Sequence, residues 1–358
     1  MDILAQIIMT IGDRVGLWDA YAFLLERMTG GRARIINFHR VADDKPYPWI
    51  ALDALTIREF EDRIRHISSK CNLLTLEELA DRILRKEPLP KNSMVVTFDD
   101  GYKDMYLNAY PILRKYGVPA TVFLTTGHID SGELFWWDKI GYVVYNTRLD
   151  TIEIDGISYS LRTIEDRAKT LDALNAEANR VSEEQKKALI SSLITVGNVK
   201  IPDGLGDKLT LSWSEIKEMS NNAIDFGAHT VTHPILTRVS LEQAKYEIIQ
   251  SKAEIENRLD KPVSTFAYPG GMSGHFNGQI IALPKQAGFK CAVTGIPGIV
   301  TQRTPMYELS RIAPAANHGA FKFLASGLWY DLREQRNMIK AHFRPHTWNK
   351  GRTKLNEN

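Results

Sequence analysis

The stretch Val96–Tyr102, Val-Thr-Phe-Asp-Asp-Gly-Tyr, is an apolar run that ends in two adjacent carboxylates and a glycine. A second such run ends within Gly227–Pro234, Gly-Ala-His-Thr-Val-Thr-His-Pro, where His229 and His233 stand four positions apart. One carboxylate and two neutral imidazoles are a common ligand set for a catalytic zinc-type ion that keeps open positions. The remaining carboxylate is then free to take a proton from water. Together the two motifs predict a metal-assisted hydrolase.

Similar apolar runs recur along the chain, with helical patterns between them. Most are continuous rather than alternating, which is typical of strands buried on both faces. The alternation of strands and helices predicts a parallel α/β barrel, in which chemistry lies at the carboxyl ends of the strands. The expected strands are 33–38, 93–98, 120–125, 223–227, 263–267, 289–294 and 307–312. The expected helices are 56–68, 75–85, 104–116, 240–258 and 277–287.

The segment 133–208 breaks this alternation. Residues 151–161 alternate around Asp155-Gly156, which indicates a β-hairpin, and 164–194 follow as polar, charged helices. We expect an inserted cap over one end of the barrel. The aromatic residues at its entry, 134–138, either pack within the cap or form a wall for a sugar or a lipid-linked ligand. The predicted domains are an N-terminal amphipathic helix (1–30), the barrel (31–132 and 209–330), the cap (133–208) and a basic C-terminal tail (331–358).

The composition excludes several classes of protein. The 358 residues carry 45 Lys and Arg against 43 Asp and Glu, a net charge of +2, so no field for nucleic acid is expected. Cys71 and Cys291 are isolated, which excludes a disulfide framework. The apolar run Ile3–Ile11 is too short to span a membrane and lacks a preceding basic region. We therefore expect a cytoplasmic protein, with peripheral contact at the inner face of the membrane as the alternative.

A third motif, Phe266–Gly271 (Phe-Ala-Tyr-Pro-Gly-Gly), completes a resemblance to a known family. With Thr97–Gly101 and the His229–His233 motif it resembles the polysaccharide deacetylases of the NodB homology type, carbohydrate esterase family 4. The resemblance runs from about residue 35 to 312, apart from the insertion. It implies a distorted (β/α)7 barrel, here with an inserted hairpin and helical cap.

The resemblance also implies residue roles. Asp99 is implied as the general base, and Asp100, His229 and His233 as ligands of one divalent metal ion. Zinc is expected by default, with cobalt or manganese as alternatives. The backbone N–H of Tyr268 is implied as an oxyanion donor. The expected reaction is attack of water on an N-acyl carbonyl, giving a free amine and a carboxylate.

The sequence departs from the common family pattern at the arginine that orients the base. Phe266-Ala267 stands where the third motif usually carries that arginine. Arg311, at the end of the last expected strand, is the candidate replacement. The alternative is a structural salt bridge.

The usual C-terminal histidine that protonates the leaving amine is also absent. Ile35–His39 is an apolar strand that ends in histidine, similar to the arrangement in circularly permuted family members. We therefore predict His39 as general acid, with a buried structural histidine as the alternative and with His275 and His318 as fallback candidates. The remaining histidines match no motif and are interpreted as structural or surface residues: His66, His128, His342 and His346.

The predicted function is removal of an N-acetyl group from an amino sugar of a bacterial surface polysaccharide, a lipid-linked glycan or a glycan precursor. Its partner is then an N-acetylated glycan or lipid-linked sugar. An O-acetyl esterase or an N-deformylase on the same fold stays open, because the acyl group contacts few atoms. A non-catalytic glycan-binding protein is the alternative from another class. The intact set Asp99, Asp100, His229 and His233 counts against it.

Overall fold

The structure, a computed structural model, describes residues 31–43, 47–49, 54–314 and 318–330, with a few isolated positions in the first 24 residues. The predicted helix at 1–30 and the predicted basic tail at 331–358 lie outside the described residues, apart from those isolated positions. Within the described part, no helix is both long and apolar enough to cross a membrane.

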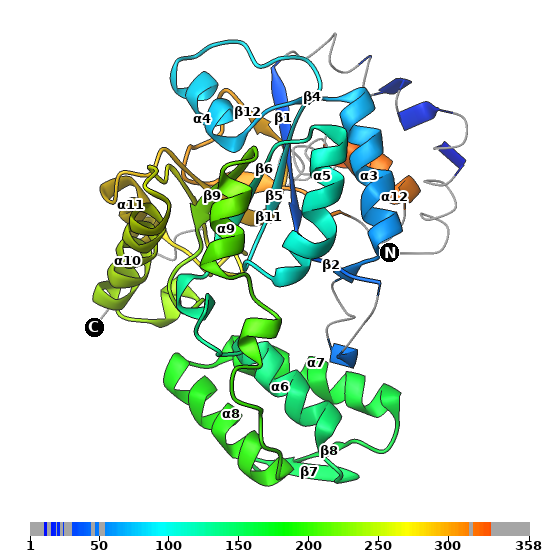
Figure 1. Cartoon of the computed structure of the whole chain (residues 1–358), viewed down its shortest axis with the longest axis vertical. Helices are drawn as coiled ribbons and strands as arrows, with labels where there is room; N and C mark the ends of the chain where they lie inside the picture. The colour runs from blue at the N-terminus through cyan, green and yellow to red at the C-terminus, as the bar shows by residue number, and fades with distance from the viewer. Residues whose placement is uncertain are drawn as a thin grey trace, which may run out of the picture.

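A parallel barrel forms the larger part of the molecule (Figure 1). Each expected strand is present, and the result is the predicted distorted (β/α)7 barrel. In spatial order its strands are β1 (Arg32–Phe38), β5 (Ser93–Phe98), β6 (Ala120–Leu124), β9 (Ile224–Ala228), β10 (Thr265–Ala267), β11 (Cys291–Pro297) and β13 (Leu309–Arg311). The short strands are β2 (Arg40–Val41), β3 (Ala54–Leu55), β4 (Asn72–Leu73) and β12 (Val300–Thr301).

The first and last parallel strands meet and nearly close the barrel. Ile36 forms a parallel bridge with Ile312, just beyond β13. The N–H of Asn37 donates to the carbonyl of Ile312 at 3.0 Å, and the N–H of Ile312 donates to Ile35 at 2.8 Å. Closure therefore brings the two ends of the barrel sequence to the same place.

Helices cover the outside of the barrel, and side-chain caps fix where several of them begin. Thr56 and Glu59 form a capping box at α3, and Thr75 and Ser240 cap α4 and α10. The predicted helix 104–116 is a π-helical turn followed by an α-helix. Pro111, in the first turn of that α-helix, has no N–H to donate to an earlier carbonyl. The outer helices are α3 (Ile57–Lys70), η2 (Met105–Ala109), α5 (Tyr110–Tyr116), α9 (Trp213–Ser220), α10 (Leu241–Leu259), α11 (Gly278–Gln286) and α12 (His318–Ser326). Helix α4 (Leu76–Leu84) instead packs against the inward-facing residues of the strands. The 3₁₀ turns are η3 (Thr126–His128), η4 (Gly206–Lys208) and η5 (Leu236–Arg238).

Alternate residues of each barrel strand face opposite sides. One set packs inside the barrel and the other packs against the outer helices. The inner set includes Ala33, Ile35, Val95, Phe123, Ala267, Val293 and Leu309. The outer set includes Ile36, Phe38, Val96, Phe98, Val122, Phe266 and Tyr268. By the same alternation, Asn37, Asp99 and Arg311 continue the inner rows at the carboxyl ends of their strands.

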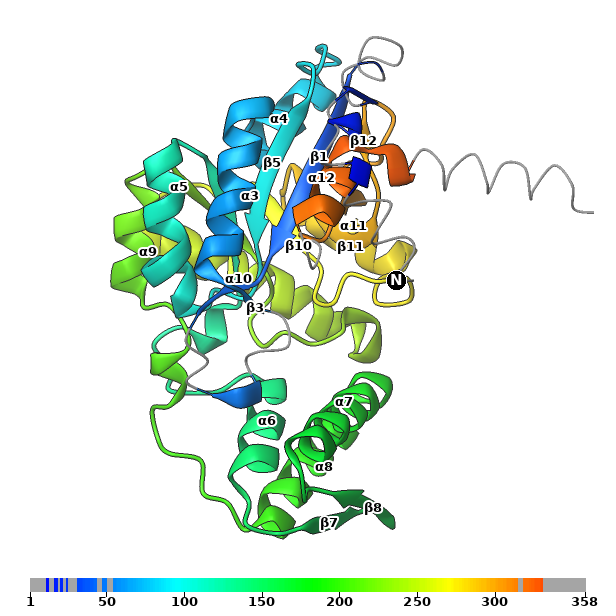
Figure 2. The ribbon, with the colours of Figure 1, turned by 90° about the vertical axis from the view of Figure 1, so that its right-hand side faces the viewer.

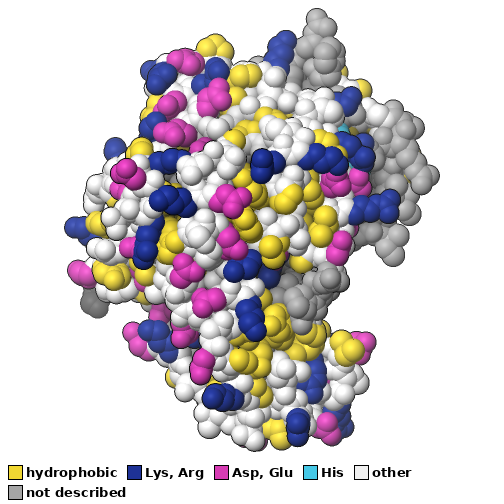
Figure 3. Space-filling view, viewed as in Figure 1, with side chains coloured by type: hydrophobic (Ala, Val, Ile, Leu, Met, Phe, Trp, Pro, Cys, Tyr) yellow, Lys and Arg dark blue, Asp and Glu magenta, His cyan; other side chains and the backbone are white. Residues whose placement is uncertain are grey.

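The inserted segment forms a lobe at one end of the barrel, with an apolar core of its own (Figures 1 and 2). Its elements are α6 (Trp136–Asn146), β7 (Thr151–Ile154), β8 (Ile157–Ser160), α7 (Ile164–Arg180) and α8 (Glu183–Gly197). The hairpin turns at Asp155 and Gly156, with φ of 51° and 77°, as a two-residue turn of this kind requires. On the surface, hydrophobic side chains gather near the junction of the two lobes (Figure 3).

Candidate active site

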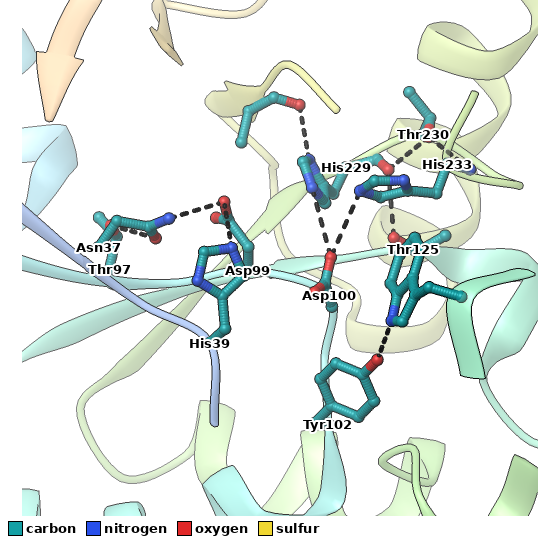
Figure 4. Close-up of polar contacts among 12 residues, drawn as sticks. Asn37, His39, Thr97, Asp99, Asp100, Tyr102, Thr125, His229, Thr230 and His233 are labelled. Atoms are coloured by element: carbon teal, nitrogen blue, oxygen red, sulfur yellow. Dashed lines mark hydrogen bonds and ion pairs between the residues drawn. The ribbon is translucent and has the colours of Figure 1, made fainter. Parts of the chain in front are cut away.

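Asp99 and Arg311 meet inside the barrel, at the carboxyl ends of the strands. Nη1 of Arg311 lies 2.7 Å from Oδ1 of Asp99, and Nη2 lies 2.7 Å from Oδ2. Asn37 adds a third hydrogen bond, from Nδ2 to Oδ2 at 3.0 Å (Figure 4). Each side chain continues an inner row, so strand alternation aims all three at one point. The predicted contact between Arg311 and the base is therefore present.

The pair with Arg311 decides the protonation state of Asp99. Burial by itself would raise the pKa of this carboxyl. The charge of Arg311, the nearby histidines and the hydrogen bonds outweigh burial and hold the pKa well below its usual range. Asp99 is therefore an ionised carboxylate with a fixed orientation.

Asp100 reaches the same site through an unusual backbone conformation. A residue directly after Asp99 on a regular strand would face the outer helices. Instead Asp100 has φ of 73° and Gly101 has φ of 81°, so the chain turns as the strand ends. Non-glycine residues with positive φ are uncommon, and those that occur are concentrated at functional sites. The turn lets adjacent carboxylates serve one centre.

Asp100, His229 and His233 bring their ligand atoms within 4.8 Å of one another. Nε2 of His229 lies 3.6 Å and Nε2 of His233 lies 3.4 Å from Oδ1 of Asp100 (Figure 4). Nδ1 of His229 lies 2.8 Å from the carbonyl oxygen of Ala267, to which it donates. That bond leaves the lone pair of His229 on Nε2, toward Asp100.

The chemistry of these three groups fits a divalent cation. Burial lowers the pKa of both His229 and His233, so both imidazoles are neutral, the form that binds metals. Burial and the charge of Asp99 raise the pKa of Asp100 well above its ordinary value. A cation at this point would stabilise the carboxylate of Asp100, which burial otherwise destabilises. The residues present therefore match the predicted metal site.

A buried carboxylate holds the loop that carries His233. Glu247, on α10, is fully buried and accepts hydrogen bonds from the N–H groups of Val231 and Thr232 at 2.7 and 2.8 Å. Its other oxygen accepts from the hydroxyl of Thr232 at 2.7 Å. The sequence prediction missed Glu247, although it is a charged residue within the inward-facing stripe of a helix. It also assigned no role to Asn37, which shares its strand face with His39.

His39 lies beside Asp99 at the carboxyl end of β1. Its Nε2 is 3.8 Å from Oδ2 of Asp99, and 46% of its side chain is exposed. It lines a cavity of about 690 Å³ together with Asp99, Asp100, His229 and His233. A substrate in this cavity can therefore contact His39, as the predicted role of general acid requires. The role itself stays a prediction.

The two fallback histidines lie elsewhere. Neither His275 nor His318 lines this cavity. His275 lies behind Gly270, which does line the cavity, and His318 packs near the rings of His66 and Phe321. Among the described residues, His39 is thus the histidine of the cavity that the metal set does not use. His342 and His346 lie outside the described residues.

The structure does not support the predicted role of Tyr268. Its N–H donates to the carbonyl of Val293 at 3.2 Å, within the ladder between β10 and β11. Its ring belongs to the outer row, where it stacks on Phe276 at 4.8 Å, and its hydroxyl donates to Tyr307. It does not line the cavity. The Phe266–Gly271 motif predicted Tyr268 to act at the site, but its backbone N–H is already used in strand pairing.

A paired carboxylate, three converging groups that fit a divalent cation and an exposed histidine line one cavity at the carboxyl end of an α/β barrel, an arrangement typical of a hydrolase site. The comparisons with known proteins agree. The family model for polysaccharide deacetylase matches residues 86–292. The chain belongs to the polysaccharide deacetylase family and is therefore an enzyme of that class. His39 and Arg311 both lie outside the matched stretch, and the permuted order of motifs stays a prediction.

Individual relatives are similar over different shares of their length. The Bacillus subtilis protein YxkH is 22% identical over 267 residues, which cover 74% of this chain and 67% of that protein. Poly-β-1,6-N-acetyl-D-glucosamine N-deacetylase of Staphylococcus epidermidis is 36% identical over 110 residues, 28% of this chain and 38% of that enzyme. In fold, the chain is similar to the Streptococcus pyogenes deacetylase PplD in complex with acetate. That similarity has a TM-score of 0.58 at 20% identity and covers 84% of this chain and 99% of the other.

Proposed function

We propose that this protein removes N-acetyl groups from amino-sugar units of a bacterial surface polysaccharide or of its precursor, with one bound divalent cation. One observation carries the proposal: the oriented carboxylate of Asp99 lies directly beside the set Asp100, His229 and His233 in a single cavity. The named N-deacetylase among its relatives supports the substrate class.

Each group has a definable task. Asp100, His229 and His233 would hold the cation, which when bound supplies Lewis-acid chemistry by polarising a carbonyl and lowering the pKa of water. Asp99, fixed by Arg311 and Asn37, accepts the proton of the attacking water. His39, open to the cavity, protonates the leaving nitrogen, because an amine leaves poorly as an anion. The products are a free amino sugar and a carboxylate.

Acyl release tests this proposal. The purified protein is incubated with N-acetylated oligosaccharides and with O-acetylated and N-formylated counterparts, with and without a chelator, and products are identified by mass spectrometry. We expect a loss of one acetyl mass from N-acetylated sugars, abolished by the chelator and restored by zinc, cobalt or manganese. Release confined to the O-acetyl or N-formyl substrate would reassign the acyl group. No release from any substrate would contradict a hydrolase.

A further inference from the structure

The cap turns one face of α7 toward the metal-binding residues. Leu171, Asn175 and Asn179 stand four residues apart and so share one side of the helix, here named the α7 face. All three line the same cavity as Asp99 and the metal ligands. The chemistry outlined above uses none of them, although they face the site where the substrate must lie.

Asn175 carries a polar group without a partner. Its Oδ1 is buried and accepts no hydrogen bond from the described part of the chain. An unpaired amide oxygen removed from water is unfavourable, and such groups in native proteins call for an explanation. Because other atoms of Asn175 line the cavity, a rotation of its amide brings this oxygen to a ligand that carries O–H donors. Sugars carry many such donors, whereas the acyl chains of a lipid carry none.

An aromatic wall stands beside the α7 face. Trp136 and Trp137, both partly exposed, line the cavity at the start of the cap. The ring of Trp137 lies 4.8 Å from the ring of His233, at 73°. Aromatic surface with a few placed amides is the usual make-up of a pocket for a neutral polar ligand.

Buried hydrogen bonds fix the cap with respect to the catalytic strand. Asp138 of α6 accepts from the hydroxyl of Tyr102 at 2.9 Å and from Nε1 of Trp49 at 3.2 Å. Nε1 of Trp137 donates to the same Tyr102 hydroxyl at 2.6 Å. Tyr102 follows Asp99-Asp100-Gly101 directly. The distance between the cap and the reacting centre is therefore set by packed, hydrogen-bonded groups.

The charges of the cavity favour an uncharged ligand. The described residues that line it include two arginines, and each is bound to a carboxylate. Arg40 pairs with Asp104 at 2.7 Å, and Arg311 pairs with Asp99. Neither arginine is free to bind a phosphate, so the cavity suits a neutral sugar better than a phosphorylated one.

We propose that the α7 face binds a second, uncharged sugar unit of the glycan, next to the unit whose acetyl group is removed. This inference rests on the proposed function and assigns Asn175 and Asn179 as specificity residues supplied by the insertion. The enzyme then prefers an oligosaccharide to a monosaccharide, and the cap is the reason.

The test compares N-acetylglucosamine oligomers of one to five units as substrates of the metal-loaded enzyme. We expect Asn175→Ala and Asn179→Ala each to raise KM for the pentamer about threefold to tenfold, the usual effect of one lost hydrogen bond. The kcat values and the monomer KM should stay unchanged. Asn179 is exposed, so its variant tests the proposal even if Asn175→Ala fails to fold. Asn146→Ala, an exposed asparagine of the cap outside the cavity, is the matched control and should behave as wild type.

Binding separates this inference from the proposed function. Titration calorimetry of the same oligomers into Asp99→Asn protein, with and without Asn175→Ala, needs no turnover. Weaker pentamer binding in the double variant supports the α7 face even if no acyl release is found. Equal KM changes for monomer and pentamer, or unchanged pentamer binding in the double variant, overturns it. A variant effect seen only with an alkyl glycoside assigns the face to a lipid chain and also overturns it.

Discussion

Arg311 and Asp99 form a two-pronged ion pair across 212 positions of sequence, with both nitrogen–oxygen distances at 2.7 Å. The guanidinium comes from the last barrel strand and the carboxylate from the second parallel one. Bidentate pairing fixes the plane of the carboxylate as well as its charge. The family's third motif usually supplies this arginine, but here another strand provides it.

The first prediction concerns Arg311→Gln. Removing the cation lets burial dominate, so the pKa of Asp99 rises and the base stays protonated to higher pH. The acid limb of the kcat/KM profile should move upward by about 1–3 pH units. Arg311→Lys keeps the positive charge but loses the bidentate geometry, so it should move the acid limb less. An acid limb in the wild-type position in both variants would show that Arg311 does not set the state of the base.

The second prediction separates the two adjacent carboxylates. Asp99→Asn should lower kcat by about 10²–10⁴-fold, as expected for loss of a general base. Metal content should stay near one ion per chain, because the ligand groups remain. Asp100→Asn should lose metal affinity, measured by mass spectrometry after dialysis. If Asp99→Asn empties the site instead, the two assignments are reversed.

The third prediction concerns His39→Ala. We expect amide hydrolysis to fall by about 10²–10⁴-fold, because the leaving nitrogen loses its proton donor. Hydrolysis of an activated aryl acetate should fall much less, since that leaving group needs little protonation. Both rates are measured on one metal-loaded preparation. Equal losses on the two substrates would indicate a structural His39.

The fourth prediction concerns stability and His128. Burial against the ring of Phe135 lowers the pKa of His128 to about 4. At pH above about 6.5 the imidazole is neutral in both the native and unfolded states. As pH falls from there toward 4, the unfolded chain binds a proton that the native state excludes, so stability is lost.

Denaturant unfolding at pH 7.5 and pH 5 measures this effect. The drop in the free energy of unfolding between the two should be smaller in His128→Asn than in wild type, by at most about 2 kcal/mol. His229 and His233 are present in both proteins, so the difference reports residue 128 together with its charge effect on His233. An identical drop in both would contradict the neutral, half-buried state of His128.

The sequence by itself determined the parts whose signals are local. Apolar runs ending in Asp-Asp-Gly and in His-x-x-x-His marked strand ends, and the β/α alternation placed those ends on one face of a barrel. The Asp155-Gly156 turn was equally local, since both residues adopt the left-handed backbone such a hairpin needs. These features depend on residues within a few positions of one another, which the printed chain shows directly.

Only the tertiary structure decided what those strand ends contact. Barrel closure placed Arg311 on Asp99, a contact that the sequence predicted only through the family resemblance, and strand pairing took the N–H of Tyr268 that the motif had suggested for an oxyanion. Glu247 of α10 accepts hydrogen bonds from the loop that carries His233, and Asn175 lines the cavity from the inserted cap. None of these contacts is encoded by spacing along the chain. They arise because closing a barrel joins segments far apart in sequence, and the hydrogen-bond partners of a buried group are fixed only once that closure is made.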